Sequence, residues 1–187
     1  MDASASIDMA EYSTMLAFVD CIVDTMNLSP SGGHAAVTLF ADNEREKNVS
    51  KAKLMIRFPD FVAPATFKQA VKSLDRTRIG SYTRINFALN HALTHMFNVK
   101  NGMRPNVNRT LVFMTDGHNR DMTDDVYRNW RQKFAAANIE IIAIGIGNRV
   151  YRSGLIELSP NDHHFPPNFA YLLSRTFQDR IVLCHGT

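Results

Sequence analysis

Cysteine is scarce in this chain, and its scarcity excludes two common kinds of small protein. Two cysteines occur among 187 residues, Cys21 inside a helix-like segment and Cys184 close to the last residue. Two thiols so placed make neither a disulfide framework nor the four-ligand set of a structural zinc site. A metal site in this chain therefore has to draw on other ligands.

Long apolar runs and clusters of one charge are also missing. No segment approaches the ~20 apolar residues that cross a bilayer, and the first residues lack the charged start and apolar core of a secretory signal. The 21 basic and 18 acidic residues are mixed along the chain, for a net charge of +3, without a Lys/Arg run. We therefore expect no membrane insertion by this chain, no signal peptide in it, and no nucleic-acid partner.

The composition that remains is that of an ordinary globular protein, with 45% hydrophobic and 21% charged residues. This length and apolar content suit one domain with a real core. No internal repeat, low-complexity tract or linker divides the chain. The sequence therefore predicts a single domain over residues 1–187.

Helix-period and strand-like segments alternate along this domain. Apolar spacing and composition predict helices at 9–26, 66–74, 83–97, 121–137 and 168–183. Short strands are expected at 34–40 and 53–58, joined by a charged loop, and nearly continuous apolar runs indicate buried strands at 110–114 and 139–146. The pattern is typical of an α/β domain with a doubly wound, mainly parallel sheet, one antiparallel edge strand, and helices on both faces.

Three short polar pieces, far apart in sequence, carry the candidate chemistry. They are Asp2-Ala3-Ser4-Ala5-Ser6 at the start, Thr83 at the start of a predicted helix, and Thr115-Asp116-Gly117 after the strand at 110–114. In an open α/β sheet, ligands bind in the crevice at the carboxyl ends of the strands, where Asp116 lies. The Asp-x-Ser-x-Ser spacing lets alternate side chains of a tight loop converge on one ion.

Carboxylates and small hydroxyls are the hard oxygen ligands that Mg²⁺, Mn²⁺ and Ca²⁺ prefer. The sequence therefore predicts a divalent metal site formed by Asp2, Ser4, Ser6, Thr83 and Asp116. Each piece alone also fits a structural role: the first as a polar start with a helix cap, Thr83 as a cap, and Asp116 in a turn.

In this order and spacing, the three pieces resemble the von Willebrand factor type A domain with its metal-ion-dependent adhesion site. The resemblance covers essentially the whole chain from Asp2 onward, including the strand end at 143–147 and the final helix closing at Cys184. Matrilin-like and collagen-associated extracellular modules look closest. The resemblance implies that Ser4, Ser6 and Thr83 offer hydroxyls to Mg²⁺, or to Mn²⁺ or Ca²⁺, while Asp2 and Asp116 act directly or through water.

The same resemblance implies a metal-dependent adhesion module of an extracellular matrix or cell-surface protein. A Glu or Asp carboxylate of a protein partner, such as a matrix protein or collagen, would fill the vacant position on the ion. No nucleophile–base pair is evident, so we expect no enzyme. Two alternatives stay open: a structural or intracellular assembly domain with a degenerate metal site, and a metal hydrolase that uses the same carboxylates.

The chain departs from the family pattern at two places. Gly80-Ser81-Tyr82-Thr83 stands where the family has Gly-Gly-Thr, and Ile85 and Asn86 replace a Thr and a Gly. Tyr82, beside the site, and His118, next to Asp116-Gly117, are therefore candidates for controlling ligand access.

The second departure is at the start, because the family's first strand, central and apolar, should precede Asp2. Only Met1 stands there. We therefore expect an N-terminally truncated domain whose sheet lacks a central strand, at a cost in ladder hydrogen bonds and core packing.

Overall fold

The computed structural model describes residues 1–42, 52–74, 80, 82–119, 122–161 and 163–165. Some parts of the chain named above lie wholly or mainly outside these residues. They are the charged loop around 42–51, the predicted helix at 168–183, Ser81 and Cys184. The helices are α1 (Met9–Val23), α2 (Pro64–Lys72), α3 (Ile85–His91), α4 (Asp124–Ala136) and α5 (Arg152–Leu158), with a π-helical turn at Ala92–Met96 and a 3₁₀ turn at Val99–Asn101. The strands are β1 (Val37–Phe40), β2 (Ala52–Ile56), β3 (Thr110–Thr115), β4 (Glu140–Gly145) and β5 (His163–His164).

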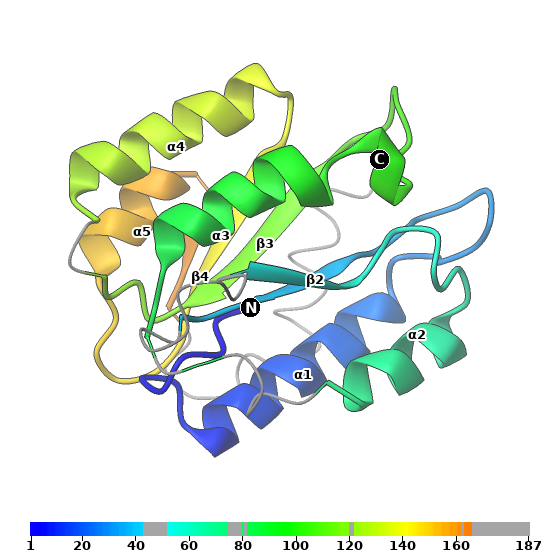
Figure 1. Cartoon of the computed structure of the whole chain (residues 1–187), viewed down its shortest axis with the longest axis horizontal. Coiled ribbons are helices and arrows are strands. Elements are labelled where there is room, and N and C mark those ends of the chain that lie inside the picture. Colours follow the sequence, from blue (N-terminus) through cyan, green and yellow to red (C-terminus); the bar gives the residue numbers. More distant parts are fainter. Residues whose placement is uncertain (43–51, 75–79, 81, 120–121, 162, 166–187) are drawn as a thin grey trace.

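The strands form two hydrogen-bonded sets. β3, β4 and β5 are parallel and lie in that order, with β3 and β4 in register from Thr110 opposite Glu140 to Thr115 opposite Gly145. β1 and β2 pair antiparallel, as the charged link between them predicts. Helices α1 and α2 lie on one side of the strands and α3, α4 and α5 on the other (Figure 1). The α/β architecture expected from the sequence is therefore confirmed.

Each side of the strands has its own apolar core. On the α1 side, Met15 and Phe18 are fully buried among Leu39 of β1 and Ile142 and Ile144 of β4. On the opposite side, the buried residues include Ile85, Leu89, Tyr127 and Phe134, packed with Leu111 and Phe113 of β3. Residues of one strand thus alternate between the two cores, which explains why β3 and β4 read as continuous apolar runs.

Local sequence signals set where α1 begins. Asp8 is its N-cap: the Asp8 carboxylate accepts from the Glu11 N–H at 2.7 Å, and the Glu11 carboxylate accepts from the Asp8 N–H at 2.8 Å. This capping box holds the first turn of the helix directly after the loop that carries Ser4 and Ser6. The helix ends at Val23, earlier than the predicted residue 26, and Asn27 then adopts a left-handed φ of 48°.

Other boundaries differ for identifiable reasons. The predicted helix at 83–97 is α-helical only over α3, after which an extra residue per turn makes the π-helical segment. α4 begins at Asp124 rather than at residue 121, with Thr123 at its N-cap position. Helix α5 was not predicted, because it is a single seven-residue segment interrupted by Gly154.

The two sets of strands meet through the first three residues of the chain. Ala3 N–H donates to Phe40 C=O at 2.9 Å, and Phe40 N–H donates to Met1 C=O at 3.1 Å, so this segment is parallel to β1. On its other side, Asp2 N–H donates to Met114 C=O at 2.9 Å. This segment therefore connects the two sheets at the carboxyl ends of β1 and β3, and no direct pairing of β1 with β3 occurs within the described residues.

Across the described residues, no helix has both the length and the apolar character that crossing a membrane would need.

Candidate metal centre

The five predicted ligands come from three segments that meet at the carboxyl ends of β1 and β3. Asp2 belongs to the extended segment Met1–Ala3 between them, and Ser4 and Ser6 to the loop before α1. Thr83 lies two residues before α3, and Asp116 directly follows β3. The fold therefore places all five at the edge where an α/β sheet binds its ligands.

Three hydroxyls form the centre of this arrangement. The Thr83 hydroxyl donates to Ser4 Oγ at 2.8 Å, Ser4 Oγ lies 2.9 Å from Ser6 Oγ, and Ser6 Oγ lies 3.4 Å from Thr83 Oγ1. Ser4 is fully buried, while Ser6 is exposed and Thr83 is half-buried. Residues almost eighty positions apart thus present their oxygens to one point that solvent reaches.

Asp2 lies beneath these hydroxyls and is completely buried. Its Oδ1 accepts from Ser4 N–H at 2.9 Å, and its Oδ2 accepts from the Thr115 hydroxyl at 2.6 Å. Burial is the largest cause that raises the pKa of Asp2, the nearby Asp116 charge adds to it, and the Thr115 and Ser4 hydrogen bonds oppose it; together they bring this pKa to about 6. A buried carboxylate in this situation is stabilised by a nearby cation.

Asp116 supplies the second carboxylate. It is 6% exposed; its Oδ1 accepts from the His118 N–H at 3.0 Å, and its backbone carbonyl accepts from the Tyr151 N–H at 2.8 Å. These bonds fix the loop after β3. Asp116 and Asp2 interact electrostatically, so the site concentrates negative charge beside the three hydroxyls.

Thr115 and Tyr127 support this loop, and of these two only Tyr127 was not recognised from the sequence. Gly117 has a φ of +77°, its N–H donates to Thr115 Oγ1 at 3.1 Å, and its carbonyl accepts from the Tyr127 hydroxyl at 2.9 Å. Thr115 therefore links the loop to Asp2, and Tyr127, fully buried on α4, anchors it from below. A tyrosine at an inward helix position is too common to signal such a role.

The candidate access residues lie on the exposed side. Tyr82 is 50% exposed, and its backbone pairs with Asp42 through two hydrogen bonds of 2.6 and 2.8 Å. Arg84 donates to the Asp42 carboxylate at 2.7 Å, which ties down the segment that carries Thr83. His118 is exposed, with its ring 6.0 Å from that of Tyr151. The influence of Tyr82 and His118 on ligand access stays a prediction.

The donor set fits a hard divalent ion. It contains two carboxylates and three hydroxyls, and no group of three or more His, Cys, Asp or Glu side chains suited to a metal occurs within the described ranges. Oxygen donors of this kind are typical of Mg²⁺, Mn²⁺ and Ca²⁺ sites rather than of sites with thiolate or imidazole ligands. The buried Asp2 carboxylate gives such an ion a compensating charge.

Known proteins with a similar sequence align with most of this chain. Chicken (Gallus gallus) Matrilin-3 is 27% identical over 168 residues, which cover 88% of this chain and 34% of that protein. Bovine (Bos taurus) Matrilin-1 is 24% identical over 197 residues, covering 98% and 32%. The chain thus spans about a third of the length of these matrilins.

Solved structures share the fold. Proximal thread matrix protein 1 from the mussel byssus, solved also "with zinc occupied MIDAS motif", has a TM-score of 0.80 and 22% identity over 97% of this chain and 44–45% of that one. Manganese-loaded Plasmodium vivax TRAP protein has a TM-score of 0.69 and 17% identity, over 95% and 70%. At these identities, the likeness shows the fold alone.

The decisive comparison is with a family model. The model of the von Willebrand factor type A domain matches residues 1–178, which is nearly the whole chain. The resemblance inferred from the three polar pieces is confirmed, and the chain belongs to the von Willebrand factor type A domain family.

Proposed function

We propose that this domain binds a protein partner through a divalent metal ion held by Asp2, Ser4, Ser6, Thr83 and Asp116. The observation that carries the proposal is the meeting of three hydroxyls from separate segments above a buried carboxylate. Zinc in the mussel protein and manganese in TRAP support a divalent ion in this family. We favour Mg²⁺, with Mn²⁺ or Ca²⁺ as substitutes, because every donor is a hard oxygen.

Each ligand has a distinct part in this proposal. Ser6 and Thr83 offer oxygens from the exposed side, Ser4 and Asp2 offer theirs from the buried side, and Asp116 adds a second negative charge. When bound, the ion supplies a positive centre for an acidic group. A Glu or Asp side chain of the partner would bind at that centre, and Tyr82 and His118 would flank its approach.

The partner that we propose is an extracellular matrix protein, with collagen as one candidate, and the location is the matrix or the cell surface. The matrilin relatives support this assignment. The site is suited to binding rather than turnover, since two carboxylates that hold an ion are not free to act as acid and base. We therefore propose a non-enzymatic role.

A domain with a degenerate metal site is the second candidate, and one observation favours it. Ile85 and Asn86 follow the metal-site threonine where the family has Thr and Gly. Ile85 is fully buried in the core, and the Asn86 side chain accepts from Trp130 Nε1 at 2.7 Å. Ile85 thus packs in the core and Asn86 hydrogen-bonds to Trp130, so Thr83 is the one ligand that the segment before α3 contributes to the ion in this proposal.

A metal titration separates these two candidates. The domain is unfolded by heat in chelator and in rising Mg²⁺ or Mn²⁺, beside an Asp116→Asn variant and an Asp125→Asn control whose carboxylate is 85% exposed. At a metal concentration 100 times the Kd, the gain is ~2.7 kcal/mol, or a Tm rise of ~5–10 °C for a domain of this size. We expect that rise in the parent and in the control, and its loss in Asp116→Asn.

A binding assay then tests the partner. Immobilised collagen and matrix proteins are probed in Mg²⁺ and in EDTA with the same three proteins. Retention that disappears in EDTA and in Asp116→Asn supports the adhesion role. Melting curves that do not change when metal is added would refute the proposal and favour the structural role.

A further inference from the structure

Two histidines lie side by side where α3 passes into the π-helical turn. His91 is the last residue of α3, and His95 lies within the turn that follows. Their rings are stacked, with 5.0 Å between the centroids and 4° between the planes. Side chains four residues apart are neighbours on a helix surface, and π-helical turns occur frequently at functional sites. The pair lies at the opposite end of α3 from Thr83, so it is separate from the metal centre described above.

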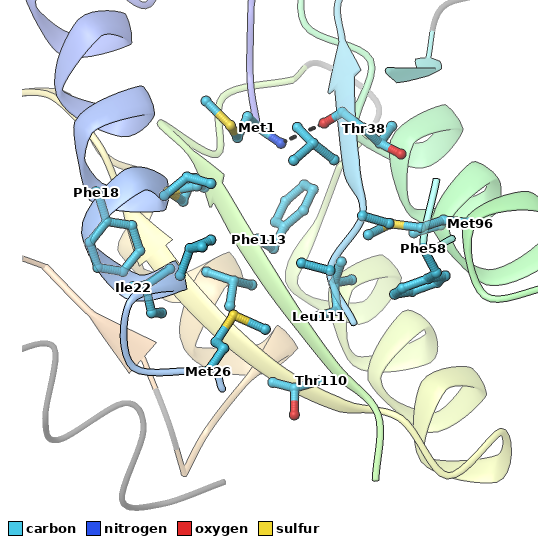
Figure 2. Close-up of a pocket in the computed structure, with 18 of the residues that line it drawn as sticks. Met1, Phe18, Ile22, Met26, Thr38, Phe58, Met96, Thr110, Leu111 and Phe113 are labelled. Atoms are coloured by element: carbon cyan, nitrogen blue, oxygen red, sulfur yellow. Dashed lines mark hydrogen bonds between the residues drawn. The ribbon is translucent and has the colours of Figure 1, made fainter. Parts of the chain in front are cut away.

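The apolar side chains of the same segment account for its packing. Ala88, Ala92 and Met96 are buried and line an internal cavity of about 150 Å³, and Figure 2 shows Met96 among the side chains around it. His95, by contrast, is exposed, and His91 is half-buried. The two imidazoles are therefore not part of the apolar core, and an ion in solvent can reach them.

Local hydrogen bonds determine which nitrogen of His95 carries the proton. The Thr94 hydroxyl donates to the Asn90 carbonyl at 2.8 Å, and the same oxygen lies 2.8 Å from His95 Nδ1. Because a hydroxyl has only one hydrogen, Nδ1 is the donor in the second contact. Nε2 therefore carries the lone pair of the neutral ring and is available to an ion. Metal-binding histidines typically donate their other N–H to a neighbour in this way.

His91 lacks the hydrogen bond that His95 has. Its Nδ1 is buried without a partner among the described residues, although buried polar atoms are normally paired. Burial lowers the pKa of His91, and the neighbouring His95 lowers it further, so the neutral form that metal ions need dominates at neutral pH. Since no hydrogen bond to the described residues fixes this ring, it can turn about its Cβ–Cγ bond toward an ion shared with His95.

We propose that His91 and His95 together bind one first-row transition-metal ion, Zn²⁺ or Cu²⁺, with water in the remaining positions. Imidazole suits these ions, whereas the oxygen donors around Asp2 suit Mg²⁺, Mn²⁺ and Ca²⁺. Zn–N bonds of ~2.0–2.1 Å place two nitrogens roughly 3.3 Å apart around a tetrahedral ion. Rings with centroids 5.0 Å apart can each direct one nitrogen at such a point after a rotation. The domain then has two metal sites of different chemistry, one at each end of α3.

Zn²⁺ is the first probe, added to the whole chain in saturating Mg²⁺ so that the oxygen site is occupied. Calorimetry counts the Zn²⁺ ions bound, and NMR follows the ring protons of the histidines. We expect one saturable site, with shifts at His91 and His95 and little change at His34 and His163. Cu²⁺ should bind more tightly than Zn²⁺, as the Irving–Williams order requires. An absence of saturable binding, or shifts confined to other histidines, would overturn the proposal.

Matched substitutions test whether both rings hold the same ion. Removing the hydrogen-bond partner of a ligand costs ~10–100-fold in metal affinity, and removing a ligand itself should cost no less. His91→Gln and His95→Gln should therefore each lower the affinity for Zn²⁺ at least ~10-fold. His163→Gln is the control and should leave that affinity unchanged, because the His163 ring is engaged with the Ser159 carbonyl at 2.9 Å. A loss in His95→Gln alone would indicate a single-histidine contact and overturn the shared ion.

Two further variants separate this site from the oxygen site. Asp116→Asn should abolish the Tm rise in Mg²⁺ and keep Zn²⁺ binding at the histidines, whereas His95→Gln should do the reverse. Thr94→Val removes the acceptor for the His95 Nδ1 proton and should weaken Zn²⁺ binding ~10-fold, while Thr94→Ser retains it. Zn²⁺ binding that is lost in Asp116→Asn and kept in both histidine variants would assign the ion to the oxygen site and overturn the proposal.

Discussion

The buried Asp2 carboxyl should lower the stability of the metal-free domain, relative to an Asp2→Asn variant, as the pH rises from about 4 to 6. Its pKa moves from the ordinary 3.8 to about 6 on folding, because burial opposes its ionised form. Between these values the folded state binds more protons than the unfolded state, so stability falls with rising pH. The loss is complete above pH 6, where the carboxylate is charged and buried.

The size of the effect follows from the shift. One pKa unit is worth about 1.4 kcal/mol, so Asp2 costs the metal-free domain ~3 kcal/mol at neutral pH. Asp2→Asn removes this titration while keeping the size of the side chain. The variant also disturbs the hydrogen bond from Thr115, at a cost of ~1 kcal/mol that does not vary with pH. The difference between the two proteins therefore reports the carboxyl group together with its interaction with the Met1 amino group, whose pKa the Asp2 charge raises.

Urea unfolding of both proteins in EDTA, from pH 4 to pH 8, measures this difference. We expect Asp2→Asn to gain up to ~3 kcal/mol on the parent as the pH rises to 6, and no more above it. Saturating Mg²⁺ should remove the parent's loss, because the ion favours the charged carboxylate, and should leave the variant unchanged. A difference that does not vary with pH in EDTA, or a parent that gains on the variant, would refute the reasoning about Asp2.

Three further substitutions test the site and its support. Thr83→Val should lower the affinity for Mg²⁺ at least ~10-fold, as measured by the Tm rise with metal, while Thr83→Ser retains that affinity. Thr94→Val is the control and should leave the affinity for Mg²⁺ unchanged, because the exposed Thr94 hydroxyl also donates a hydrogen bond of 2.8 Å, but within its own helix. Tyr127→Phe leaves the Gly117 carbonyl without its donor, so we expect the free energy of unfolding, measured with urea, to fall by ~1–2 kcal/mol. Unchanged stability would argue against the role of Tyr127 in anchoring the loop. Gly117→Ala places a side chain on a residue with a φ of +77°, with its Cβ 3.3 Å from the Cβ of Tyr151. This change should lower the free energy of unfolding by ~1–2 kcal/mol in the same assay. An unchanged free energy would mean that the loop adopts another conformation.

Sequence reasoning was most successful where one segment carries its own signal. The apolar runs of β3 and β4 and the apolar spacing of α1 depend on residues within those segments, and the structure has them close to the expected bounds. Helix α5 and strand β5 have seven and two residues, too few for a period to be recognised. Their place is set by packing against α4 and β4, which no local pattern reports.

The same distinction between local signals and packing applies to the residues of the candidate site. Asp116 was predictable because it follows a recognisable strand, and Asp2, Ser4 and Ser6 because they keep a spacing typical of one ion site. That Thr83 reaches Ser4, and that Thr115 holds Asp2, depends on contacts across 79 and 113 residues. Such contacts follow from how the fold brings α3 and β3 next to the segment Met1–Ala3 and the loop after it, so the sequence identified the residues but not their partners.

The position of Asp2 in the metal site depends on the segment Met1–Ala3. The hydrogen bonds of Asp2 N–H to Met114 C=O and of Ala3 N–H to Phe40 C=O hold this segment between β1 and β3, and with it the Asp2 side chain beneath the hydroxyls. An ion bound to Asp2 would order the segment further. Since such coupling is reciprocal, a change that orders Met1–Ala3 should also tighten metal binding by the same free energy.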